Sequence, residues 1–506
     1  MSQQRNRDAA FCGKVPLNQT NLIQPHGVLL IVAKEDLTVL QVSENISEIS
    51  GKAASDLAGK TLDQLVPAAE AALLQERFSQ PIEGKIPLTL SFEQDGVLKK
   101  FLSLVQAQEQ YYMIEIEKEP TGATDDSFIA VYQELKYVIA AIEATETFEE
   151  TAQLVVTELK RISGFDKIMV YQFDADWNGT VIAEAKEEGM DTYLGLKFPA
   201  SDIPAQAREM YRKNPYRFIP DAGYQPVRLY PVLNPVTGGF TDLTDSNLRS
   251  VAGVHIEYLR NMGVTASMST RIVKDGKLWG LISCHHRTAK NLSYQMCSLF
   301  ELLSTIISAK VASVEQNREF RFKSQMHELY SKLVERIYAS STLADGLQQH
   351  ELLKLLNAGG VAVVLNKQIQ LYGDTPASRQ VEDLIFWLQA RGVSKTYQAI
   401  NLSAAYEGAL EYATEASGLL ALPVQPEKGS YVLAFRPEAV QNVAWGGNPE
   451  EAVTFEPDGK KYHPRHSFSV WKEQVQKVAV PWNPQELEIA EQFRNFIVEY
   501  TLNKRA

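Results

Sequence analysis

The chain has 506 residues, a length typical of three or four domains that each bury a core. Its composition suits a globular protein, with 45% hydrophobic and 22% charged residues. The net charge of −12 and the lack of Lys/Arg runs argue against a nucleic-acid partner. Apolar runs such as Val28–Ala33 are of strand length and the N-terminus is polar, so we expect a cytoplasmic protein without a membrane partner.

The three cysteines are Cys12, Cys284 and Cys297, and their spacing does not suit a metal site. An odd number cannot all pair, so we expect reduced thiols and no bound metal. Cys12 lies in a polar, irregular arm formed by residues 1–20. A thiol on such an arm is either a chance surface cysteine or a reactive group, and the arm alone does not decide.

Short apolar segments follow the arm. Strands are predicted at Val28–Ala33, Thr38–Ser43, Leu88–Phe92, Leu98–Gln106 and Tyr111–Glu117, and helices at Ala53–Leu57 and Leu62–Leu65. This order resembles a PAS domain, although periodicity alone fits any small α+β domain. Lys118–Asp126 contains Pro120 and Gly122 and is predicted to be a linker.

A second region begins with two helices and continues with hairpins. Helical spacing covers Phe128–Ile142 and Phe148–Ile162, and hairpins are predicted at Lys167–Phe173 with Thr180–Ala185 and at Ala266–Lys274 with Lys277–His285. The first hairpin would turn around Asp174–Gly179, where Asn178-Gly179 is a strong turn signal, and the second around Asp275-Gly276. Asn214–Gly239, between the hairpins, is predicted to be irregular. The pattern indicates an α+β domain with an antiparallel sheet.

The final third repeats this pattern beyond a long helix. Neither Gly nor Pro occurs between Leu281 and Asp345, and apolar residues recur there at helical spacing, which predicts one long helix. Two helices with an unmarked break are the alternative. Later elements are strands at Gly360–Asn366, Leu419–Pro426 and Tyr431–Arg436, and a helix from Pro484. We therefore expect two related α+β domains joined by the long helix. The intervening Pro437–Trp471 is longer than ordinary loops, which indicates a functional or disordered segment.

One short stretch, Phe198–Arg208, holds a carboxylate between two prolines. Pro199 and Pro204 restrict the backbone on both sides of Asp202. Such a stiff mount either aims the carboxylate at a partner or lets Ser201 or Asp202 cap the following helix. This stretch alone leaves both interpretations open.

Enzymatic chemistry finds little support. Cys284 and His285 are adjacent on a predicted strand and so point to opposite faces, and no phosphate-binding glycine loop is present. The second region instead gathers aromatic, histidine and arginine residues around its hairpins. Arg217 and Arg249 would suit a ligand with two carboxylates, and the aromatic residues would suit a flat, conjugated body.

Several longer motifs carry a family resemblance. They are Ile23–Gly27, Phe198–Arg208, His255–Val264, Trp279–His286, Trp445-Gly446-Gly447, Pro464–Phe468 and Trp471-Lys472-Glu473. Together they resemble a bacteriophytochrome. The resemblance implies an arm at 1–20, a PAS domain at 21–120, a GAF domain at 121–310 and a PHY domain at 311–506 with a "tongue" at about 437–475. It also implies a figure-of-eight knot between the arm and the GAF domain.

The resemblance further implies a linear tetrapyrrole in the GAF domain that red light isomerises at C15=C16. Many phytochromes attach it through a cysteine that precedes the histidine matching His255, but here that position is Val254. Cys12 matches the attachment cysteine of bacteriophytochromes. We therefore expect biliverdin IXα bound to Cys12 through a thioether.

The family pattern assigns further site residues. The expected cofactor-binding residues are Tyr171, Phe198, Asp202, Ile203, Tyr211, Arg217, Arg249, His255, Tyr258, Ser267, Ser269 and His285. Within this set, Tyr211, Arg217, Arg249, Ser267 and Ser269 would hold the propionates. The expected signal relay comprises Asp202, Arg465, Ser467, Trp445 and Trp471, with Asp202 paired to Arg465. Ala252 departs from relatives that carry a hydroxyl there.

The resemblance also implies a parallel homodimer through the GAF and PHY helices and a downstream effector domain or response regulator. No kinase motif is present, so we expect no enzymatic activity in these residues. The alternative is a PAS–GAF protein that senses another small molecule or has a structural role. Cys12, Asp202 and His255 together favour the photoreceptor.

Overall fold

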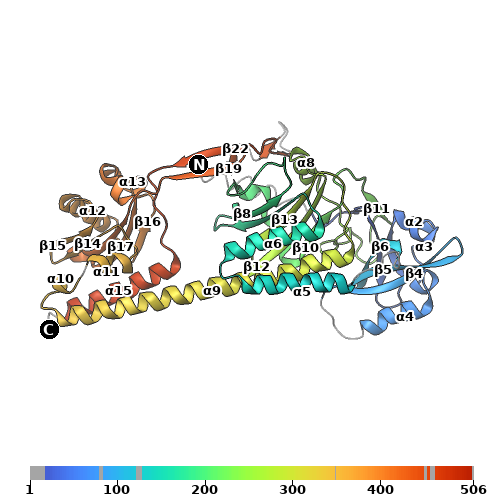
Figure 1. Ribbon diagram of the computed structural model, residues 1–506, viewed down its shortest axis with the longest axis horizontal. Helices are drawn as coiled ribbons and strands as arrows, with labels where there is room; N and C mark the ends of the chain where they lie inside the picture. Colours follow the sequence, from blue (N-terminus) through green and yellow to red (C-terminus); the bar gives the residue numbers. More distant parts are fainter. Residues whose placement is uncertain are drawn as a thin grey trace. The chain divides into compact units, whose positions relative to one another are not determined.

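A computed structural model describes residues 17–78, 84–120, 128–347, 349–449, 453–455 and 462–503. The chain divides into two compact units (Figure 1). The first unit contains Met1–Val314 and Ala444–Trp471, and the second contains Glu315–Val443 and Lys472–Ala506. The long insertion that begins after β18 thus contributes residues to both units.

The first unit begins with a seven-stranded sheet. Its strand order is β1 (Leu22–Ile23), β11 (Val227–Tyr230), β3 (Val39–Ser43), β2 (Gly27–Ala33), β6 (Tyr111–Pro120), β5 (Val97–Ala107) and β4 (Ile86–Gln94). Its short helices are η1 (Glu44–Ile46), α2 (Ser47–Ser50), α3 (Ala54–Leu57), η2 (Leu62–Gln64) and α4 (Ala68–Arg77). They pack on one face of the sheet over buried aliphatic residues of β2 and β6. This element order confirms the predicted α+β pattern.

Strand β11 was not expected. It lies within Asn214–Gly239, which was predicted to be irregular, yet it pairs with both β1 and β3. A four-residue edge strand leaves a weak local signal, because its pairing partners lie about two hundred positions away. This strand ties the later segment to the first sheet. The predicted knot also involves residues 1–16, which lie outside the described residues, and it stays a prediction.

The second sheet has eight strands. Their order is β10 (Tyr216–Ile219), β12 (Ala266–Lys274), β13 (Lys277–His286), β7 (Lys167–Phe173), β8 (Gly179–Lys186), β9 (Lys197–Phe198), β19 (Gln441–Gly446) and β22 (Val470–Val475). The helices α5 (Phe128–Ala144), α6 (Phe148–Ser163) and α9 (Tyr294–Ala339) supply the core of one face (Figure 1). On the other side lie η3 (Ala200–Asp202), α7 (Ala205–Lys213) and α8 (Gly253–Asn261). The site described below lies on this second side.

Both predicted hairpins of this sheet form, but one turn differs. At Asp275-Gly276 both residues have positive φ, as a tight primed turn requires. In the other hairpin Trp177 has the positive φ, and the Asp174 carboxylate accepts the backbone N–H groups of Asp176 and Asn178. The hairpin thus turns within the predicted Asp174–Gly179 segment, but the Asp174 carboxylate and Trp177 shape the turn, and Asn178-Gly179 is not its central dipeptide.

The long helix is continuous, as predicted, and α9 has 46 residues. Part of it is long and apolar enough to pass for a membrane span, with a mean hydropathy of 1.5, but 39% of that part is buried. Core helices of globular proteins pass the same test, so this is weak evidence for a membrane.

The second unit contains a five-stranded antiparallel sheet. Its order is β15 (Gln368–Gly373), β14 (Gly360–Leu365), β18 (Ser430–Arg436), β17 (Gly418–Gln425) and β16 (Tyr397–Ala399). One face packs on α11 (Gln349–Leu355), α15 (Pro484–Asn503) and the end of α9, with α10 (Leu343–Gly346) nearby. The other face packs on α12 (Ser378–Ala390), α13 (Leu402–Ala405), η4 (Glu407–Tyr412) and α14 (Ala413–Ala416), and η5 (Pro426–Lys428) closes the β17–β18 turn. The insertion also contains β20 (Val453–Phe455) and β21 (Tyr462–Pro464). The expected fold class, α+β with antiparallel sheets joined by a long helix, is confirmed.

Candidate functional site

A large cavity lies on the side of the eight-stranded sheet away from α5, α6 and α9. The space open to the centres of water-sized molecules is ≈ 250 Å³. A single water needs only about 10–15 Å³ on this measure, so the cavity has room for a large organic ligand. Its walls come from the sheet, from α7 and α8, and from residues 246–252.

All twelve predicted cofactor residues in the described part of the chain line this one cavity. They are Tyr171, Phe198, Asp202, Ile203, Tyr211, Arg217, Arg249, His255, Tyr258, Ser267, Ser269 and His285. The thirteenth, Cys12, lies outside the described residues. The cavity thus brings together residues that are far apart in the sequence, from Tyr171 to His285.

Strand alternation explains how one sheet supplies both a core and a cavity wall. Ser267, Ser269 and His285 face the cavity. Their strand neighbours Met268 and Cys284 point to the opposite face and pack against the helices. Cys284 is therefore buried away from His285, and burial raises the pKa of its thiol well above the ordinary value. The structure agrees with the expectation that these two residues form no catalytic dyad.

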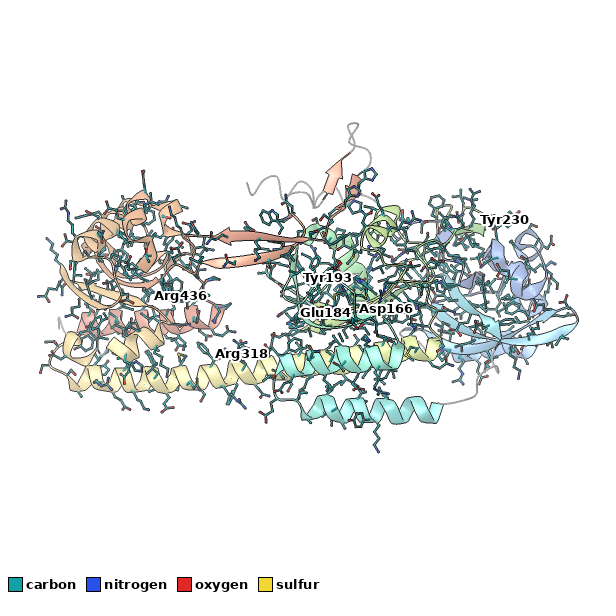
Figure 2. The ribbon with its side chains drawn as sticks, turned by 45° about the horizontal axis from the view of Figure 1, so that its top comes forward. Asp166, Glu184, Tyr193, Tyr230, Arg318 and Arg436 are labelled. Carbon is teal, nitrogen blue, oxygen red and sulfur yellow. The ribbon has the colours of Figure 1, made fainter. Side chains whose placement is uncertain are left out.

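A glycine makes room for one wall residue. A Cβ at Gly179 would lie 1.7 Å from the ring of Tyr171, so a side chain at this position would displace that tyrosine. The Tyr171 ring contacts Phe173 and Phe198, with centroids 5.3 and 6.2 Å away. Tyr193, labelled in Figure 2, packs against Phe198 from the other side at 5.7 Å. Tyr171, Tyr193 and Phe198 together form the aromatic wall of the cavity.

Another part of the cavity wall carries two guanidinium groups, those of Arg217 and Arg249. Arg217 donates to the carbonyls of Asn247, at 3.2 Å, and Arg249. Arg249 donates to the carbonyls of Thr244, at 3.3 Å, and Leu243, at 3.5 Å. Among the described residues, no carboxylate forms an ion pair with either arginine.

Burial lowers the pKa of both arginines. For Arg249 the pKa falls to about 9, first through burial and then through the neighbouring charge of Arg217. Two enclosed cations without a protein anion are costly, so they favour an anionic ligand. Tyr211, hydrogen-bonded to Ser269, lines the same cavity, and the charges of Arg217 and Arg249 act on its hydroxyl.

Two histidines supply neutral imidazoles. His255 borders the open space but is enclosed by the cavity walls, and this enclosure, with Arg217, lowers the pKa to about 4. His285 is packed into the sheet, and burial lowers its pKa to about 3. Its Nε2 lies 3.3 Å from the Ser283 hydroxyl. Both rings can therefore donate and accept hydrogen bonds without a charge at neutral pH.

Asp202 pairs with the insertion. Its Oδ1 accepts from Arg465 Nη2 at 2.5 Å, and its Oδ2 accepts from the Tyr258 hydroxyl at 2.9 Å. The side chains of Arg465 and Asp202 are only 2% and 5% exposed. Burial raises the pKa of the Asp202 carboxyl, while Arg465 and Tyr258 act in the opposite direction. The predicted pairing of Asp202 with Arg465 is therefore present in the structure.

This contact decides between the two interpretations of Phe198–Arg208. The helix α7 has Pro204 as its N-cap residue, and no side chain caps it by a hydrogen bond. The capping interpretation is wrong for both Ser201 and Asp202, because the proline places the helix start beyond them. The stiff turn aims its carboxylate at a partner.

The insertion packs directly on the aromatic wall. Trp445 of β19 pairs in parallel with Lys197 of β9, and its side chain is buried. A Cβ at Gly446 would lie 2.5 Å from the Phe198 ring, so these two chains are in close contact. On the other side Phe468 meets Tyr258 edge-on, with centroids 5.1 Å apart.

Two of the predicted relay residues lie elsewhere. Ser467 is exposed, and its hydroxyl accepts the backbone N–H of Ser469. Trp471 is partly exposed on β22 and does not line the cavity. The structure therefore brings Asp202, Arg465 and Trp445 to the aromatic wall but not Ser467 or Trp471.

Sequence reasoning missed several wall residues. Met169, Leu281 and Tyr193 line the cavity, and Asn261 donates to the Arg465 carbonyl at 3.0 Å. Met169 and Leu281 could have been found from alternation, because they lie an even number of positions from the predicted wall residues Tyr171 and His285 on the same strands. The Asn261 contact left no such signal. No cluster of metal-binding side chains occurs within the described residues.

Comparisons with known proteins agree with this architecture. Family models for the PAS fold, the GAF domain and the phytochrome region match residues 12–119, 147–311 and 326–506. Cyanobacterial phytochrome B of Nostoc sp. is 38% identical over 501 residues, which cover 98% of this chain and 67% of that protein. The bacteriophytochrome of Pseudomonas aeruginosa is 33% identical over 98% of this chain and 67% of its own length.

Solved structures match over nearly the whole chain. The crystal structure of bacteriophytochrome RpBphP3 from R. palustris has a TM-score of 0.85 at 33% identity and covers 98% of this chain and 100% of that chain. The Stigmatella aurantiaca phytochrome photosensory core module has a TM-score of 0.83 at 34% identity, with 97% and 98% covered. The chain spans about two thirds of the length of the curated relatives named above. It therefore belongs to the phytochrome family of light photoreceptors, and its PAS, GAF and PHY regions make up a bacteriophytochrome photosensory module.

Proposed function

We propose that the chain is a red/far-red photoreceptor module that holds biliverdin IXα in the cavity of the eight-stranded sheet, attached to Cys12 by a thioether. The observation that carries this proposal is the pair of enclosed arginines, Arg217 and Arg249, which have no ion-pair partner among the described residues. Biliverdin brings two propionates, and guanidinium groups bind carboxylates with two parallel hydrogen bonds. When bound, the bilin would supply absorption of red light and Z/E isomerisation at its C15=C16 bond.

The remaining cavity residues fit this ligand. Neutral His255 and His285 offer hydrogen bonds to ring nitrogens and carbonyl oxygens and add no further positive charge beside the two arginines. Tyr171, Phe198 and Tyr258 offer aromatic surface to a flat body. The backbone of the Asp202 turn is stiffened by prolines, so its carbonyl and carboxylate keep their positions while a ligand moves.

The Asp202–Arg465 pair is the proposed start of the signal. If a change in the cavity draws the Asp202 carboxylate away, the Arg465 guanidinium loses its ion-pair partner. It then stays buried, with its hydrogen bond to the backbone carbonyl of Gly446. A buried charge that loses its partner costs about 3–5 kcal/mol. That cost is large enough to favour a different conformation of the tongue (residues 437–475), and we propose that the tongue then changes from strand to helix. A C-terminal effector or response regulator would receive the signal through α15.

The test is a light-minus-dark spectrum of protein assembled with biliverdin. We expect a red-absorbing state that converts to a far-red-absorbing state and back, and an irreversible or absent difference would refute the photoreceptor function. Which of the two states is stable in the dark does not affect this test.

The attachment site has its own prediction. A Cys12→Ala variant should lose the zinc-enhanced fluorescence of the bilin in a denaturing gel, because the thioether is the bond that survives denaturation. A Cys297→Ala variant is the control, because the Cys297 thiol is buried in the helix-side core. Retained fluorescence in Cys12→Ala would place the attachment elsewhere.

A further inference from the structure

Both ends of the tongue meet at one buried arginine of the second unit. Arg436 is the last residue of β18, where the tongue leaves the sheet, and Val480 and Pro481 lie where the chain returns. The Arg436 Nη1 donates to the carbonyls of Val480 at 3.0 Å and Pro481 at 2.8 Å. One guanidinium thus links the segment that leads into the tongue to the segment that follows it. Arg436 is labelled in Figure 2.

The same guanidinium reaches two further elements. Its Nε donates to the carbonyl of Asn357, beyond α11, at 2.8 Å, and its Nη2 lies 3.0 Å from Glu486 Oε2 in α15. The ring of Trp482 stacks beneath it, with 4.2 Å from the guanidinium carbon to the centroid. The Arg436 and Glu486 side chains are 8% and 7% exposed, so water screens this pair little.

Glu486 also fixes the start of α15. Its Oε2 accepts the Asn483 N–H at 2.8 Å, while the Asn483 side chain accepts the Glu486 N–H at 2.8 Å. This is a reciprocal capping box, with Pro484 at the first helical position. The carboxylate that pairs with Arg436 is therefore also part of the cap of α15.

Close packing leaves this junction little freedom to move independently. A Cβ at Gly418 of β17 would lie 2.6 Å from Ala479 Cβ and 3.4 Å from the Trp482 ring. The Trp482 Nε1 donates to the Leu356 carbonyl at 2.9 Å. Segment 479–482 is thus held against the sheet at the point where it enters α15.

We propose that Arg436, Glu486 and Asn483 form a clasp that couples the base of the tongue to the N-terminus of α15. The inference rests on the proposed function, in which the tongue changes conformation. A displacement of residues 480–481 or of the end of β18 would shift the guanidinium, and the guanidinium forms an ion pair with the carboxylate that caps α15. Arg436 and Glu486 are positioning residues, since neither lines the cavity.

The test is a mutational cycle read by hydrogen exchange of the first turn of α15. Arg465→Ala removes the contact to Asp202 and so disturbs the tongue without light. In the chain with the intact clasp, we expect it to speed exchange of that turn at least fivefold. In the Arg436→Met/Glu486→Gln background, the same change should alter exchange less than twofold. The double variant leaves no unpaired buried charge, and thermal unfolding checks its fold.

Control variants distinguish loss of coupling between the tongue and α15 from general destabilisation of the second unit. Glu488→Gln removes a carboxylate that is 56% exposed two positions along the same helix, and it should leave the response to Arg465→Ala unchanged. Arg436→Lys keeps the charge but cannot make all these contacts, so it should give an intermediate response. If the double variant does not fold, this lysine variant carries the test.

The outcomes are distinguishable from those of the photoreceptor proposal. An equal response of α15 with and without Arg436 and Glu486, or no response to Arg465→Ala in the intact chain, would overturn the clasp. A missing red/far-red difference spectrum in the unmutated chain would refute the photoreceptor function and leave the cycle interpretable. With photochemistry intact, the double variant should photoconvert normally while light no longer alters exchange of the first turn of α15.

Discussion

Arg249 shows how a single residue can indicate the charge of a ligand. Its guanidinium is buried, donates to the carbonyls of Leu243 and Thr244, and lies beside a second cation, Arg217, which lowers its pKa further. Such a group destabilises the empty protein and stabilises a complex with an anion. The sign of a mutational effect should therefore differ between the two forms.

An Arg249→Met variant tests this at the residue scale. Without bilin we expect an unchanged or higher melting temperature, because an uncompensated charge leaves the interior. With biliverdin we expect affinity to fall at least tenfold, about 1.4 kcal/mol, as one carboxylate partner is lost. Arg161→Met, on the surface of α6, is the control for both measurements. Unchanged affinity would show that Arg249 does not anchor the ligand.

His285 makes the stability of the bilin-free protein depend on pH. Burial lowers its folded pKa to about 3, below the ordinary value of 6.5, so the unfolded chain binds the proton more strongly. The stabilisation from keeping this histidine neutral is complete above about pH 6.5 and is lost as the pH falls toward 3. The full loss is at most about 5 kcal/mol. In urea titrations, a His285→Asn variant should lose less stability than the unmutated protein between pH 6.5 and 4.5, and parallel curves would contradict this.

At the scale of elements, contact between β19 and the aromatic wall depends on a glycine. A Cβ at Gly446 would lie 2.5 Å from the Phe198 ring, and the ring is held between Tyr171 and Tyr193. Overpacking of this kind costs about 1–3 kcal/mol, and here the strand can relieve it by moving away from the wall.

A Gly446→Ala variant should therefore loosen the tongue. We expect the amide of Trp445 to exchange about tenfold faster in the dark and the tongue to be cleaved sooner in limited proteolysis. Gly239→Ala is the matched control, because a Cβ there meets no atom within 4 Å. Adding Phe198→Leu should restore part of the protection, and unchanged exchange in Gly446→Ala would show that the wall accommodates the methyl group.

At the scale of the whole molecule, the helices carry exposed aromatic residues. Phe320 on α9 is 73% exposed and Tyr137 on α5 is 67% exposed. Large apolar side chains in such positions are typical of helix–helix interfaces between chains. They support the proposed homodimer through the GAF and PHY helices.

A Phe320→Glu variant should weaken this dimer. We expect the dissociation constant from sedimentation or light scattering to rise at least tenfold, because a charge enters an apolar interface. Val97→Glu introduces the same charge at another exposed position, in the β4–β5 hairpin, where the residue is 58% exposed, and should have no effect. If both variants stay dimeric, the interface lies on another face.

Local patterns predicted most elements because local physics forms them. The hairpin at Asp275-Gly276 needs two residues that tolerate positive φ, and Pro484 marks the start of α15, so neither depends on distant contacts. The predicted strands β7, β12 and β13 agree with the structure to within one residue at each end. In contrast, β9 and β11 have two and four residues, and only pairing with remote strands stabilises them.

The candidate site divides in the same way. Strand alternation alone places Ser267, Ser269 and His285 on one face, and the prolines around Asp202 identify a stiff turn. No local pattern predicts that Asp202 meets Arg465, which lies 263 positions away, and the family resemblance supplied that expectation. Ser467 came from the same resemblance, yet it lies exposed, because the backbone turn after Arg465 directs it outward.

By itself, the sequence determined the α+β class and the family and favoured one long helix, because periodicity, turn residues and contiguous motifs are local. Only the tertiary structure decided that the Asp202 carboxylate binds Arg465 instead of capping α7, since that choice depends on which chain folds over the turn. The same holds for the clasp at Arg436, whose partners come from three separate segments. Two charged side chains become a buried pair only when the folded interior brings them together, so no local stretch of sequence predicts the pair.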